Sequence, residues 1–174
     1  MISLARRLLA VLMAASVVAL DVAPALAALQ VRVDQGVTEP IPLAIPDFVG
    51  AAQGRDIAQV VRADLERSGL FKALPPASYI EKISDINVPP RFGDWRTIQA
   101  QGLVTGQAIA QPDGRLRVEF RLWDIFGESQ MVGLQYAATP ENWRRIAHLV
   151  SDAIYERITG EKDRKSTRLN SSHT

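Results

Sequence analysis

The side chains that most often perform catalysis are few in this chain. It has no Cys and two His, His148 and His173. A metal site usually needs three or four His, Cys or carboxylate ligands, and a nucleophile needs a neighbouring base. We therefore expect neither a metal site nor a nucleophile–base pair. His148 lies off the apolar stripe of its predicted helix, which indicates a surface residue.

Three carboxylates, Asp56, Asp64 and Glu66, share another predicted helix. Residues two apart on a helix do not face each other, so Asp64 and Glu66 are not spaced as an acid–base pair. We expect a solvated face. Residues 50–54, before that helix, could bind an anion at its amide end. They lack the Lys and Ser/Thr of a phosphate loop, which favours a plain connector.

One pattern is typical of a binding surface. Trp123 alternates with arginines at positions 115, 117 and 121. Aromatic residues and Arg are enriched where interfaces gain most of their energy. The pattern predicts a surface hot spot at Trp123 and Arg121. The alternative is a Trp that stacks on the surface without a partner.

The arginines and Trp123 lie on the second arm of a predicted hairpin, residues 103–124. On that arm four apolar residues alternate with polar ones: Leu116, Val118, Phe120 and Leu122. A period of two predicts a strand with one buried and one wet face. Pro112, Asp113 and Gly114 supply the turn between the arms.

Two amphipathic helices can cover the buried face. The first, residues 55–68, carries a stripe of Ile57, Val60, Val61 and Leu65. The second follows the helix-start sequence Thr139-Pro140-Glu141 and has an apolar stripe that runs to Ile158.

Further strands are expected at 43–49, 71–74 and 131–137, and a short helix at 95–101. The predicted fold is α/β (α+β). It is a two-layer domain with a mixed four- or five-stranded sheet, covered on one face by two amphipathic helices. A short third helix is expected on the same face.

Both ends differ from the domain. Residues 1–27 are predicted to be a cleavable signal peptide, with Arg6 and Arg7, an apolar run over 8–20 and a small-x-small site at Ala25-Leu26-Ala27. The alternative is an uncleaved anchor, although a run of about 13 residues is short for a membrane span. The expected protein is exported, is soluble and has no disulfide.

Residues 163–174 have no apolar period, and 163–173 resemble the translated read-through of a sequencing adapter. We interpret 163–174 as a disordered tail and an artefact; a genuine polar tail is the alternative. The whole chain has 20 basic and 19 acidic residues, but residues 28–162 have 15 and 17. The net charge of −2 gives no reason to expect nucleic-acid binding.

The first residues after the signal form a candidate binding arm, residues 28–36. Leu29, Val31 and Val33 alternate with Gln30, Arg32 and Asp34. Such a strand can add to the open sheet edge of a partner. The alternative is that it is the first edge strand of the domain's own sheet.

Four segments together are recognisable: LQVRVDQGVTEPIPLAIPDFVG, IAQVVRADLERSGLFKAL, VTGQAIAQPDGRLRVEFRLWDIFG and VSDAIYERITGEK. Over residues 28–162 the chain resembles the N-terminal domain of the TolB family, periplasmic proteins of the Tol-Pal system. The resemblance implies a non-enzymatic protein with no cofactor and no small-molecule substrate. It links inner- and outer-membrane partners, maintains outer-membrane integrity and supports cell division, and colicins exploit the system during import.

The resemblance also implies the partners. A TolA-like inner-membrane protein binds the arm, which here is Leu29, Gln30, Val31, Arg32, Val33, Asp34, Gln35 and Gly36. A Pal-like lipoprotein binds a C-terminal β-propeller, and this chain is expected to be truncated before it. Two alternatives stay open: a periplasmic small-ligand-binding domain or enzyme on an α/β layer, and an adaptor that never had a propeller.

Overall fold

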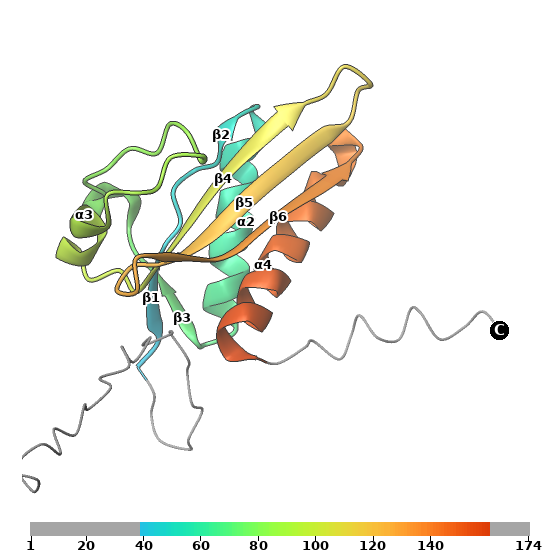
Figure 1. The fold of residues 1–174 in the computed structure, drawn as a ribbon. Helices are drawn as coiled ribbons and strands as arrows, with labels where there is room; N and C mark the ends of the chain where they lie inside the picture. Colours follow the sequence, from blue (N-terminus) through green and yellow to red (C-terminus); the bar gives the residue numbers. More distant parts are fainter. Residues whose placement is uncertain (1–38, 161–174) are drawn as a thin grey trace, which may run out of the picture.

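A computed structural model describes residues 39–160 of the chain. Its centre is a mixed sheet, drawn in Figure 1. The signal peptide, the arm at 28–36 and the tail at 163–174 lie outside the described residues, so those predictions are not tested by the structure.

The sheet has six strands instead of the four or five expected. The strands are β1 (Ile41–Ala44), β2 (Val49–Gly50), β3 (Phe71–Ala73), β4 (Gly102–Ala110), β5 (Leu116–Asp124) and β6 (Ser129–Ala138). They are arranged in the order β3-β1-β4-β5-β6, and β2 also pairs with β4. The pairs among β1, β2, β3 and β4 are parallel, whereas β4–β5 and β5–β6 are antiparallel. The predicted hairpin is therefore confirmed as β4 and β5.

Two long helices pack on one face of this sheet: α2 (Gln53–Arg67) and α4 (Trp143–Thr159). They lie side by side in Figure 1. Two residues after the end of α2, Gly69 is left-handed, and its N–H donates to the carbonyl of Glu66. The α4 helix follows a 3-10 turn, Pro140–Asn142. The predicted pair of covering helices is thus confirmed.

The main core lies between these helices and the sheet. The predicted buried row of the hairpin is confirmed, since Leu116, Val118, Phe120 and Leu122 are all at most 2% exposed. The helix stripes meet this row with Ile57, Val61, Leu65, Ile146, Val150 and Ile154. Because side chains alternate across a strand, the residues between those of the buried row face the other side of the sheet.

A second, smaller core lies on that other side. It contains Ala44, Trp95, Ala100, Leu103, Trp123 and Ile125. Trp95 belongs to the short helix α3 (Phe92–Thr97), which is part of the segment between β3 and β4. The expectation that the third helix joins the other two on one face is therefore wrong. The segment between β3 and β4 covers the opposite face of the sheet. Its sequence has no regular hydrophobic period from which this position could be predicted.

The strand expected at 43–49 is interrupted. Pro46 has no N–H, and the chain leaves the sheet between β1 and β2. The side chain of Arg62 on α2 holds this bend, with Nη1 2.6 Å from the Ile45 carbonyl and Nη2 3.0 Å from Asp47 Oδ1. Phe48, which is 4% exposed, enters the main core from the bend.

A glycine on β4 makes room for Phe48. A Cβ atom placed on Gly106 would lie 2.4 Å from the Phe48 ring, well inside van der Waals contact. The ring therefore lies directly over the backbone of the central strand. This contact fixes the distance between the bend at 45–48 and β4.

We expect Gly106→Ala to lower the free energy of unfolding by about 1–3 kcal/mol, because the added methyl group overpacks the core at Phe48. Gly133→Ala on β6 is the matched control. Its Cβ would meet the flexible end of Gln130, so the change should stay within about 0.5 kcal/mol. Urea denaturation followed by circular dichroism measures both values. Equal effects for the two variants would contradict the tight contact.

Candidate interaction surfaces

The predicted arm, residues 29–36, lies outside the described residues. The structure does show where the arm would join the domain, because β1 begins at Ile41. That strand already has neighbours on both sides, β3 and β4. The N–H of Ile41 also donates to the Leu70 carbonyl at 2.8 Å.

The predicted hot spot at Trp123 is not on the surface. Trp123 is 7% exposed, and its ring packs edge-to-face against Phe92 with centroids 6.1 Å apart. Its Nε1 donates a hydrogen bond of 3.1 Å to Thr105 Oγ1. The expectation of a wet face at this end of the hairpin is wrong, because the segment between β3 and β4 covers it.

Arg121, the other residue of the predicted hot spot, is half-buried and holds that covering segment in place. Its guanidinium donates to the Ile86 carbonyl through Nη1 and to Asn87 Oδ1, at 2.6 Å, through Nη2. Ile86 itself is 1% exposed. Both members of the predicted hot spot therefore make contacts within the domain.

A carboxylate organises the same segment from within. Glu81 Oε2 accepts hydrogen bonds from Trp95 Nε1 at 2.6 Å and from the N–H of Arg91 at 2.9 Å. Its side chain is 14% exposed. A charged acceptor strengthens such bonds when water is partly excluded. Glu81 thus orders the irregular chain around the buried indole of Trp95.

Tyr79 ties this segment to the sheet. Its hydroxyl accepts from the N–H of Ile45 at 3.0 Å and donates to the Leu74 carbonyl at 2.9 Å. It therefore satisfies one backbone group just after β1 and one just after β3. Burial raises the pKa of the Tyr79 phenol, so the hydroxyl stays protonated at neutral pH and keeps both bonds.

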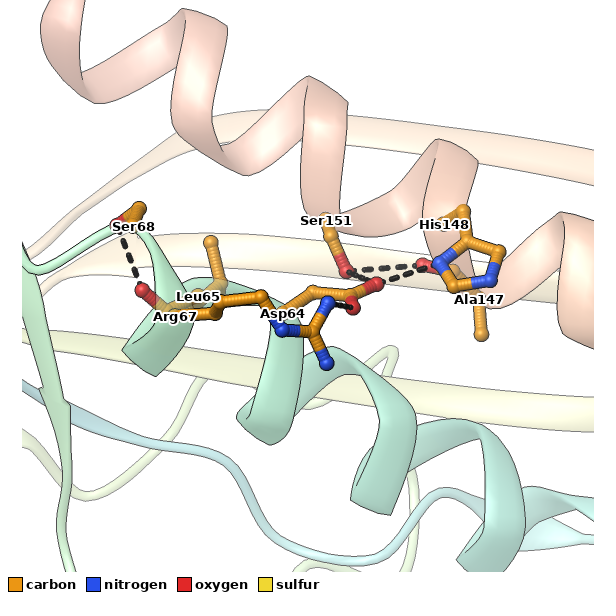
Figure 2. Close-up of polar contacts among 7 residues, drawn as sticks. All are labelled: Asp64, Leu65, Arg67, Ser68, Ala147, His148 and Ser151. Atoms are coloured by element: carbon orange, nitrogen blue, oxygen red, sulfur yellow. Dashed lines mark hydrogen bonds and ion pairs between the residues drawn. The ribbon is translucent and has the colours of Figure 1, made fainter.

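A polar cluster links the two long helices, as Figure 2 shows. Asp64 Oδ2 on α2 lies 2.6 Å from His148 Nδ1 and 3.3 Å from Ser151 Oγ, both on α4. Asp64 Oδ1 accepts from Arg67 Nη1 at 2.9 Å. The Asp64 side chain is 14% exposed, so the expected solvated face is wrong for Asp64. Asp56, Glu66 and His148 are exposed as expected.

The residue types of this cluster resemble those of a hydrolase triad, but the geometry differs. A triad requires the serine hydroxyl to meet a histidine nitrogen. Here Ser151 and His148 approach the same carboxylate oxygen, and the 4%-exposed Ser151 also donates to the Ala147 carbonyl at 3.0 Å. The arrangement fits a link between helices.

Neither a metal-binding cluster nor a membrane-spanning helix occurs in residues 39–160. No group of three or more His, Cys, Asp or Glu side chains able to hold a metal ion occurs within this range. None of the helices described there is long and apolar enough to cross a membrane.

Comparison with known families gives a match over residues 29–131, to the TolB amino-terminal domain. The match covers more than half of the chain. The chain belongs to the TolB amino-terminal domain family. The matched range includes all eight residues predicted to bind the partner, 29–36.

Three solved structures are similar to this chain to different degrees. TolB from Acinetobacter baumannii is 26% identical, with a TM-score of 0.61; the match covers 72% of this chain and 30% of that one. This TolB-family chain therefore spans under a third of that protein's length. The C-terminal domain of LpoB from Salmonella enterica is 12% identical at a TM-score of 0.46, with 61% and 87% of the two chains covered. PelC from Paraburkholderia phytofirmans is 10% identical at a TM-score of 0.44, with 70% of this chain and 88% of that chain covered.

We expect Tyr79→Phe to lower the free energy of unfolding by about 1–3 kcal/mol, because Ile45 N–H and the Leu74 carbonyl lose their shared partner. Tyr136→Phe is the matched control. The Tyr136 hydroxyl reaches the Leu149 carbonyl only at 3.5 Å, so its loss should change stability by less than about 0.5 kcal/mol. Chemical denaturation compares the two. A neutral Tyr79→Phe would show that water replaces the hydroxyl.

Proposed function

We propose that the chain is a non-enzymatic protein–protein interaction component of the Tol-Pal system in the periplasm. Family membership is the observation that carries this proposal, because the match begins at Leu29 and so includes the arm. The proposal includes export and removal of residues 1–27, which rests on their signal-peptide pattern. In this role the protein helps to maintain outer-membrane integrity and to support cell division, and colicins can exploit it.

The proposed binding segment is the arm, Leu29 to Gly36, and the proposed partner is a TolA-like inner-membrane protein. The arm would add as a strand to an open sheet edge of the partner. Backbone hydrogen bonds would supply affinity, and Leu29, Val31 and Val33 would supply specificity on one face.

The side of the sheet that contains β1 and β3 disfavours the arm as an edge strand of the domain's own sheet, whereas the other edge, β6, is open. The strand that follows the arm, β1, is flanked on both sides, so the arm cannot pair with it. The edge next to β1 is β3, which has only three residues. A strand of eight residues would find few partners there.

Binding of a Pal-like lipoprotein is proposed only for a chain that carries a β-propeller. The domain described here corresponds to a minor part of the Acinetobacter TolB chain. For residues 28–162 the proposal concerns the inner-membrane partner alone.

Deletion of residues 29–36 should abolish binding to the C-terminal domain of a TolA-like protein, because the deletion removes the proposed strand. The thermal midpoint should barely change, since the described core begins at Ile41. Isothermal titration calorimetry and thermal denaturation measure the two effects.

A matched pair of substitutions refines the test. Val31→Asp places a charge on the apolar face of the arm and should weaken binding at least about tenfold. Gln30→Asp adds the same charge on the polar face and should change binding by less than about threefold. If the deletion unfolds the domain, or leaves binding intact, the proposal fails.

A further inference from the structure

The outermost strand, β6, has an unusually open edge. It is ten residues long, and within the described part of the chain it pairs only with β5. Its sequence, SQMVGLQYAA, contains no charged residue and no proline. Figure 1 shows β6 at the side of the sheet remote from β3.

The opposite edge is protected in several ways. Strand β3 has three residues, carries Lys72 in its middle and is followed by two prolines. Glu66 Oε1 also accepts a hydrogen bond of 3.3 Å from the N–H of Ala73. Short length, Lys, Pro and covered backbone groups are the usual means by which proteins stop an edge from pairing. The β6 edge is long and has no Lys, and its one flanking proline, Pro140, follows the strand.

The side chains of β6 leave apolar surface beside the open backbone. Val132, Leu134 and Tyr136 face the helix layer, as their partners on β5 do. Leu134 is 43% exposed, and Leu149 on the neighbouring α4 is 37% exposed. On the other face, Gly133 and Gln135 are exposed. An added strand would cover Leu134 and pair the free backbone groups in one step.

We propose that β6 pairs antiparallel with β6 of a second copy of this chain, about a two-fold axis at Leu134. Directly opposed residues of an antiparallel pair share a face. An axis at Leu134 places Leu134 opposite Leu134 of the second copy and Val132 opposite Tyr136. On the outer face Gly133 lies opposite Gln135. A register shifted by one residue would place side chains of the helix face of one copy opposite side chains of the outer face of the other.

The composition of β6 suits a partner of identical sequence. Self-pairing of a charged strand places like charges near each other, which is destabilising. An uncharged strand avoids that penalty. The β-bulge between β5 and β6 lies at Leu122/Trp123, near the start of β6, so the strand from Val132 onward is regular.

The pairing also ends at two copies. It joins both β6 edges into one continuous sheet, and each end of that sheet is then a protected β3 strand. A symmetric contact that uses the same surface on both subunits is closed. The structure thus favours a dimer over an open fibre.

The weight-average mass of the chain, measured by sedimentation equilibrium, should rise toward twice that of one chain as concentration increases. Gln135→Lys adds a protective charge at an exposed position of the edge and should weaken association at least about tenfold. Gln59→Lys, at an exposed position of α2, is the matched control and should leave association unchanged. A wild-type chain that stays monomeric throughout, or equal association of the two variants, overturns the proposal.

Cross-linking tests the register. The chain has no native Cys, so an introduced thiol has no competitor. Two Leu134→Cys chains should form an intermolecular disulfide under mild oxidation, because directly opposed residues lie within disulfide range. Gln130→Cys chains should not, since residue 130 would lie opposite Ala138. Equal cross-linking of both variants would show random collision and contradict the proposed axis.

Discussion

The central hairpin of β4 and β5 must be buried on both faces, and the rest of the domain is arranged to meet this constraint. On one face Val118 and Phe120 need the cover of α2 and α4. On the other face Leu103 and Trp123 need the cover of the segment between β3 and β4. Burial of these apolar side chains supplies most of the stabilising free energy. Polar groups such as Tyr79, Glu81 and Arg121 fix the irregular cover in position.

The regular part of this arrangement could be predicted from the sequence. Strict alternation from Leu116 to Leu122 identified the strand and its buried face. Helical spacing of Ile57, Val61 and Leu65 identified α2 as a covering helix. These signals are local, because a period of two or of 3.6 residues follows from the geometry of a single element. The approximate bounds of the hairpin and of both long helices followed from them.

The second core could not be predicted in this way. Trp123 alternates with the residues of the buried row, so the period alone places it on a solvent-exposed face. Its burial depends on Trp95 and Phe92, which are distant in the sequence. Asp64 and His148 are likewise 84 residues apart in sequence, although their side chains meet. Such contacts depend on the tertiary fold. The proposed arm was assigned from the alternation of Leu29, Val31 and Val33 and from family resemblance, and it lies outside the described residues.

We therefore propose that the TolB-family chain combines a folded domain with two covered faces and an N-terminal arm that binds a partner. Amide hydrogen exchange of the whole chain, with and without the C-terminal domain of a TolA-like protein, tests this division most directly. The account predicts that residues 29–36 gain protection on binding, while the amides of β4 and β5 keep the exchange rates of the free protein. Protection gained on the domain surface, with residues 29–36 unchanged, would contradict it.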